Sequence, residues 1–68
     1  MTELSEISMF IEDIENVKGE LKYEVATTPG ESERVKSLLS LAATDLGTAI
    51  AFLKMSEIEK MAEIKMAS

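Results

Sequence analysis

The feature that most constrains this chain is the spacing of apolar residues between positions 31 and 54. Apolar residues recur there at alternating steps of four and three: Val35, Leu39, Ala42, Leu46, Ala49 and Leu53. This alternation is typical of an α-helix that packs lengthwise against another helix. A second row of small residues follows at steps of four: Ala43, Gly47 and Ala51. Because small residues let another backbone approach closely, we expect this helix to lie at the centre of a helical assembly.

The first part of the chain has the same helical spacing. Its apolar positions are Ile7, Phe10, Ile11, Ile14, Val17, Leu21 and Val25. Charged residues cover much of the opposite side, so the pattern predicts an amphipathic helix over about residues 3–26. The run Thr-Thr-Pro-Gly at 27–30 is a strong helix breaker, and Thr28 with Glu31 fits the capping box of a following helix. The sequence therefore predicts a turn at 27–30.

The second helix is predicted to run from about 29 to 55. Beyond it the apolar pattern changes phase at Ser56, so the helix either kinks there or continues to about 66. We expect a mostly continuous helix, because no glycine or proline intervenes. A turn this short implies an antiparallel pair. The predicted fold is all-α: residues 1–68 form one domain, an antiparallel helical hairpin with a long second helix.

Composition indicates how such a hairpin is stabilised. A chain of 68 residues forms one small domain whose core alone supplies little stability. It has no cysteine, so neither a disulfide nor a thiolate metal site can help. The remaining route is self-association, and we expect a compact helical homo-oligomer.

Charge and residue types also exclude several classes of function. The net charge of −6 argues against binding duplex nucleic acid. We expect no membrane span, because Lys54 ends the apolar run, and the acidic N-terminus is unlike a secretory signal. A cytoplasmic protein is predicted. The absence of histidine and of a glycine-rich phosphate loop predicts no enzyme activity, no cofactor and no metal site.

Lysines provide one candidate site. Lys18 and Lys22 lie one turn apart on the first helix, and a hairpin would bring Arg34 and Lys36 near Lys22. Two interpretations remain open. The cations form ordinary surface ion pairs, which contribute only a few tenths of a kcal/mol each. Alternatively they form a clamp for a phosphate, which a symmetric oligomer would repeat around its axis.

Short polar residues on the second helix provide another candidate. Thr44 and Thr48 lie one turn apart, and their hydroxyls either bond the carbonyl of the preceding turn or contact a ligand. Asp45 either forms a salt bridge or accepts hydrogen bonds from the edge of a guanine base. For Phe10, as for the methionines, a place in the core is the ordinary interpretation.

Residues 42–53, Ala-Ala-Thr-Asp-Leu-Gly-Thr-Ala-Ile-Ala-Phe-Leu, resemble the second helix of a known family. These are the small phage proteins that counter CBASS immunity, the cyclic-oligonucleotide sponges. The runs Leu-Ser-Glu-Ile at 4–7 and Val-Lys-Gly-Glu-Leu at 17–21 are similar to that family's first helix. The resemblance covers most of residues 4–53. Where the family has an arginine and a glutamine, this chain has Ala43 and Gly47.

The resemblance implies a non-catalytic phage protein, a hexamer in the host cytoplasm, that sequesters cyclic di- or trinucleotides and so antagonises CBASS signalling. Thr44 and Thr48 match family positions associated with the ligand, and Lys18 matches a phosphate-facing lysine. Phe10 is the aromatic residue nearest to the position that stacks on a base in the family. Periodicity alone supports an alternative equally well: a dimeric four-helix bundle that binds or inhibits a partner protein without a nucleotide.

Overall fold

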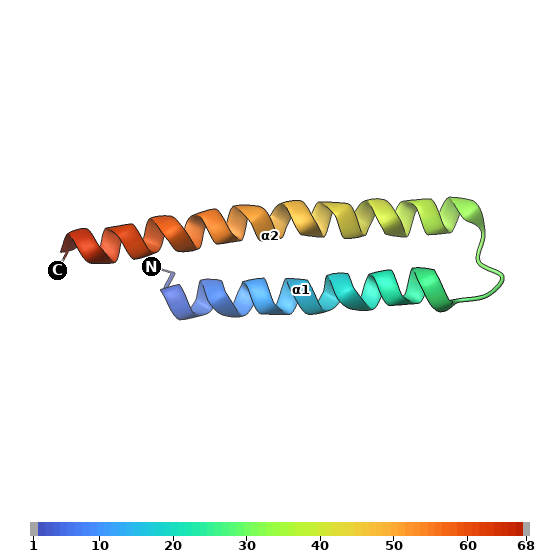
Figure 1. The fold of residues 1–68 in the computed structure, drawn as a ribbon, viewed down its shortest axis with the longest axis horizontal. Helices are drawn as coiled ribbons and strands as arrows, with labels where there is room; N and C mark the ends of the chain where they lie inside the picture. The colour runs from blue at the N-terminus through green and yellow to red at the C-terminus, as the bar shows by residue number, and fades with distance from the viewer. Residues whose placement is uncertain (1, 68) are drawn as a thin grey trace.

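The protein is a two-helix hairpin, seen here in a computed structural model that describes residues 2–67. Helix α1 spans Leu4–Thr27 and helix α2 spans Glu33–Ala67, with 24 and 35 residues respectively. The helices lie side by side and antiparallel, and α2 extends past the start of α1 (Figure 1). The all-α hairpin with a long second helix, predicted from the sequence, is confirmed.

The turn ends later than the sequence predicted. Helix α1 closes where the Thr28 N–H donates to the Glu24 carbonyl at 3.0 Å. The chain then reverses through Gly30, whose φ of 76° lies in the region that favours glycine. Helix α2 begins at Glu33, not at 29, and the Ser32 hydroxyl accepts the Val35 N–H at 3.2 Å. Ser32 therefore caps α2, and the predicted capping box of Thr28 with Glu31 is wrong.

Helix α2 continues without a break through Ser56 to Ala67, as the sequence predicted. The Ser56 hydroxyl donates to the Phe52 carbonyl at 3.1 Å, so its polar group is satisfied within the helix. No kink is needed to accommodate the change of apolar phase.

The two helices meet along one seam, which we call the hairpin seam. Its less exposed positions on α1 are Leu4, Ile7, Ile11, Ile14, Lys18, Leu21 and Val25. On α2 they include Lys36, Leu39, Ala43, Leu46, Ile50, Leu53, Glu57 and Lys60. Both sets alternate strictly between steps of three and four, as in a coiled coil. Four of these side chains are buried, with exposed fractions of 3–8%: Ile7, Ile11, Ala43 and Ile50.

The predicted faces of both helices need correction. On α2 the seam holds Ala43 and Ile50, whereas Val35 and Ala42, which were expected there, are exposed. Packing against α1 selects this phase because it buries Ile50 and places the small Ala43 where the helices approach. On α1, Phe10 and Val17 are 45% and 50% exposed. Each of them directly precedes a seam position, Ile11 or Lys18, and therefore lies on the flank of the seam.

Much of the apolar surface of α2 faces outward. Leu38, Leu41, Phe52 and Met55 are 59–64% exposed. Among residues 2–67, α2 is by length and composition apolar enough to cross a membrane: an 18-residue stretch of it has a mean hydropathy of 1.4, and 11% of that stretch is buried. From the sequence we expected no membrane span, because Lys54 ends the apolar run. A cytoplasmic location therefore stays a prediction.

Candidate functional site

A lysine occupies the middle of the hairpin seam. Lys18 is half-buried between Ile14 and Leu21, at a position that the heptad repeat assigns to an apolar side chain. Placing an ammonium group there removes part of its hydration, which costs free energy unless a partner compensates. The presence of a charged side chain at this seam position therefore requires an explanation.

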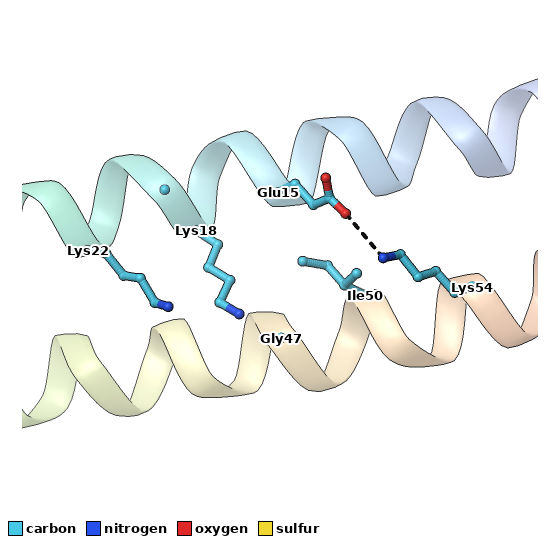
Figure 2. A pocket seen from close by; sticks show the side chains of 7 residues that line it. Glu15, Lys18, Lys22, Gly47, Ile50 and Lys54 are labelled. Carbon is cyan, nitrogen blue, oxygen red and sulfur yellow. Dashed lines mark ion pairs between the residues drawn. The ribbon is translucent and has the colours of Figure 1, made fainter.

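Gly47 makes room for this lysine. A Cβ atom added at Gly47 would lie 2.9 Å from the Lys18 Nζ, closer than real Cβ contacts allow. Figure 2 shows the side chains of Lys18 and Lys22 extending from α1 toward α2, with the Lys18 ammonium group close to the backbone at Gly47. A glycine inside a helix costs about 1 kcal/mol relative to alanine. Here the missing side chain is the space that the ammonium group fills.

Two adjoining cavities along the edge of the seam share Lys18 and Lys22. One has a volume of about 380 Å³ and is lined by Glu15, Lys18, Gly19, Lys22, Gly47, Ile50 and Lys54. The other has a volume of about 350 Å³ and is lined by Lys18, Lys22, Ser40, Ala43 and Thr44. We call the two together the lysine groove. Both cavities are partly open to solvent. Figure 2 shows the residues that line the first cavity, which lies between the two helices.

The groove concentrates positive charge on an acidic chain. Three lysines line it against one carboxylate, that of Glu15. Glu15 pairs with Lys54 at 3.6 Å. Within residues 2–67, neither Lys18 nor Lys22 has a carboxylate at ion-pair distance. Two adjacent ammonium groups without a counterion are the arrangement that attracts an anion with more than one charge, such as a phosphate diester pair.

The structure brings together three of the six residues that the sequence singled out. Lys18, Lys22 and Thr44 all line the lysine groove. Thr48 and Asp45 are exposed on α2 and line neither of its cavities. Phe10 is exposed on α1 and likewise does not contribute to the groove.

Both threonine hydroxyls bond within the helix. The Thr44 hydroxyl donates to the Ser40 carbonyl at 3.1 Å, and that of Thr48 donates to the Thr44 carbonyl at 3.4 Å. This was one of the two interpretations of the sequence. The Thr44 oxygen keeps its acceptor capacity toward the groove, since a hydroxyl has two lone pairs.

Sequence reasoning did not assign the other groove residues to a site; they include Glu15, Ser40, Gly47 and Lys54. Gly47 was noted for its size, but its contact with Lys18 requires the register of the two helices. Lys54 lies far along α2 and is brought opposite Glu15 only by the antiparallel pairing. Lys36, which was expected near Lys22, pairs with Glu33 at 3.8 Å instead. Arg34 is exposed and lines neither cavity of the groove.

The chemistry that the groove offers is binding. Its polar groups are ammonium, hydroxyl and one carboxylate, so it can hold an anion by charge and hydrogen bonds. In residues 2–67 no cluster of three histidine, cysteine, aspartate or glutamate side chains is placed to hold a metal ion.

Comparison of the chain with protein-family models, with curated proteins and with solved structures gives no match.

Proposed function

We propose that this protein binds and sequesters a cyclic di- or trinucleotide without cleaving it, using the lysine groove of a homo-oligomer, and thereby antagonises CBASS-type signalling. The phosphates of the ligand lie against Lys18 and Lys22, and Thr44 provides a polar contact beside them. Sequestration acts by mass action, because each bound messenger is withdrawn from the pool that an effector senses.

The observation that carries this proposal is the unpaired Lys18 on the hairpin seam. An apolar residue at this position would pack against α2 and stabilise the hairpin, so lysine is a costly choice for stability alone. Gly47 adds to that cost, since alanine is the better helix former. Both residues suit a site that must keep an ammonium group close to the α2 backbone. The family resemblance of residues 42–53 supplies the class of ligand.

The exposed apolar face of α2 favours a second candidate function. Leu38, Leu41, Phe52 and Met55 project from α2 on the side away from the seam. Exposed apolar patches of this kind mark protein interaction surfaces. In this alternative the hairpin forms a dimeric four-helix bundle that binds or inhibits a partner protein, and no nucleotide is involved.

Thermal unfolding with a panel of cyclic di- and trinucleotides tests the proposal. A ligand that binds only the folded protein raises stability by about 2.7 kcal/mol at a concentration a hundred times its Kd. We expect a higher Tm with at least one cyclic nucleotide, and no change with its linear mononucleotides. The ligand released by denaturing the protein should be intact when analysed by chromatography.

Variants make this experiment specific. Lys18→Met and Lys22→Met should each abolish the shift in Tm, whereas Lys60→Met should keep it. Lys60 is an apt control because it is also a half-buried lysine on the hairpin seam, but it lies outside the lysine groove. No shift with any nucleotide would contradict the proposal and favour the protein-binding alternative.

A further inference from the structure

Helix α2 carries a second coiled-coil stripe on the side turned away from α1. It consists of Leu38, Leu41, Asp45, Thr48, Phe52 and Met55, and we call it the outer stripe. Its steps alternate between three and four, as those of the hairpin seam do. All six residues are exposed, although four of them are large and apolar. Nothing else in residues 2–67 covers this stripe.

We propose that the outer stripe pairs with the same stripe of a second copy in an antiparallel homodimer, whose two-fold axis passes beside the peptide bond between Leu46 and Gly47. A two-fold interface brings one surface against itself, so its residues must match in reverse order. The stripe meets this requirement. Leu38 faces the partner's Met55, and Leu41 faces the partner's Phe52. Each of these pairs is centred on the same axis.

The polar residues of the stripe match in the same way. Asp45 faces the partner's Thr48, so the carboxylate accepts a hydrogen bond from the partner's hydroxyl, and symmetry repeats the bond. The Thr48 hydroxyl now donates to the Thr44 carbonyl at 3.4 Å, a long bond that is readily exchanged for a charge-assisted one. A shift by one heptad would bury Asp45 against an apolar residue. This polar layer therefore fixes the register, as buried polar residues do in coiled coils.

Charge complementarity continues past both ends of the stripe. One heptad step beyond Leu41 is Arg34, and one beyond Phe52 is Glu59; both are exposed. In the same antiparallel register, Glu59 faces the partner's Arg34. Beside the stripe, Ala42 lies near the partner's Ala49, and side chains this small let the two α2 helices approach closely. Opposite charges and small residues thus occur where this one arrangement needs them.

A second copy explains the stripe better than a bilayer does. Asp45 lies in the middle of the apolar stretch, where a carboxylate in contact with lipid is costly. Among residues 2–67, the side chains that the hairpin buries by itself are Ile7, Ile11, Ala43 and Ile50, a small core that a second hairpin would extend. The inference rests on the proposed homo-oligomer and names its interface, but it does not depend on the ligand. A larger assembly such as a hexamer would use this pairing as one of its contacts.

Cysteine cross-linking tests the register directly, because the chain has no cysteine of its own. The double variant Leu41→Cys with Phe52→Cys should form a disulfide-linked dimer on mild oxidation. Leu41→Cys alone should not, since the two copies of residue 41 would lie about 16 Å apart along the helix axis. The same separation prevents the double variant from closing a disulfide within one chain.

Light scattering on variants tests whether the outer stripe is the dimer interface. Leu41→Glu should lower the measured mass, whereas Tyr23→Glu, at an exposed aromatic residue on α1, should leave it unchanged. Arg34→Glu should raise the dimer dissociation constant about tenfold, because it places two carboxylates opposite each other at both ends. Adding Glu59→Arg to the same chain should restore the original constant.

Several outcomes would overturn the inference, and they differ in meaning. If Leu41→Cys alone cross-links as readily as the double variant, or if Leu41→Glu keeps the parent mass, this interface is wrong while self-association stands. A monomer at every concentration contradicts self-association itself. Binding of a monomeric chain to phosphatidylcholine vesicles, lost in Leu41→Glu, would assign the stripe to a bilayer. If the ligand-induced shift in Tm persists in Leu41→Glu, ligand binding in the lysine groove does not require the outer-stripe interface, and the proposed function stands whether or not this interface is correct.

Discussion

At the scale of single residues, the pairing of Lys18 with Gly47 is the most unusual feature of the hairpin. A half-buried lysine on one helix faces a glycine on the other, and the ammonium nitrogen takes the place of the missing Cβ atom. Each residue is a poor choice for stability, and together they keep a cation at the edge of the seam. Substitutions at these two positions should therefore separate stability from binding.

Lys18→Met should stabilise the hairpin and abolish ligand binding. Methionine buries its side chain against α2 without an ammonium group to desolvate, so we expect a gain of about 1 kcal/mol in the free energy of unfolding. Urea unfolding measures the first effect and calorimetric titration with the cyclic nucleotide measures the second. If binding survives, Lys18 serves only to fix the register of the two helices.

Gly47→Ala should stabilise the protein less than Gly19→Ala does. Both replace a helical glycine, which is worth about 1 kcal/mol. A Cβ at Gly19 meets nothing within 4 Å, but at Gly47 it displaces the Lys18 ammonium group. The difference between the two midpoints of urea unfolding measures the cost of moving Lys18. Equal gains would mean that the ammonium group is not held in this space.

At the scale of the helices, α2 explains both the success and the limits of sequence reasoning. Its length and continuity followed from the absence of glycine or proline near Ser56. Its orientation about its own axis did not, because apolar residues lie on two sides of the helix and periodicity permits two seams. Only the match with α1 selects the one containing Ala43 and Ile50. The position of Lys18 was missed for a related reason, since a search for apolar residues passes over a lysine on the seam.

The start of α2 provides a test at this scale. Ser32→Ala removes the acceptor for the Val35 N–H and should lower the free energy of unfolding by about 1 kcal/mol. Thr28→Ala should cost less than half as much, because the Thr28 hydroxyl contacts only the exposed Glu24 carboxylate, at 3.3 Å. Urea unfolding compares the two variants. A larger loss at Thr28 would place the cap of α2 where the sequence first suggested it.

At the scale of the whole molecule, the hairpin is a thin rod with principal-axis extents of 56 × 16 × 15 Å. Because residues 2–67 contain four buried side chains, we predict that the hairpin depends on association for much of its stability. The Tm should therefore rise with protein concentration, as mass action requires when subunits unfold on dissociation. Calorimetry over a wide range of concentration measures this. A Tm independent of concentration, with full helicity after dilution, would show that one hairpin is stable alone.

The placement of both chain ends at one end of the rod has a practical consequence (Figure 1). A fluorescent protein fused to either terminus occupies the same pole, and the loop around Gly30 is left bare at the other. Two such fusions in an antiparallel pair would hold their fluorophores at opposite poles, whereas a parallel pair would bring them together. Energy transfer between differently coloured fusions would then reveal, inside a living cell, which way the rods are aligned.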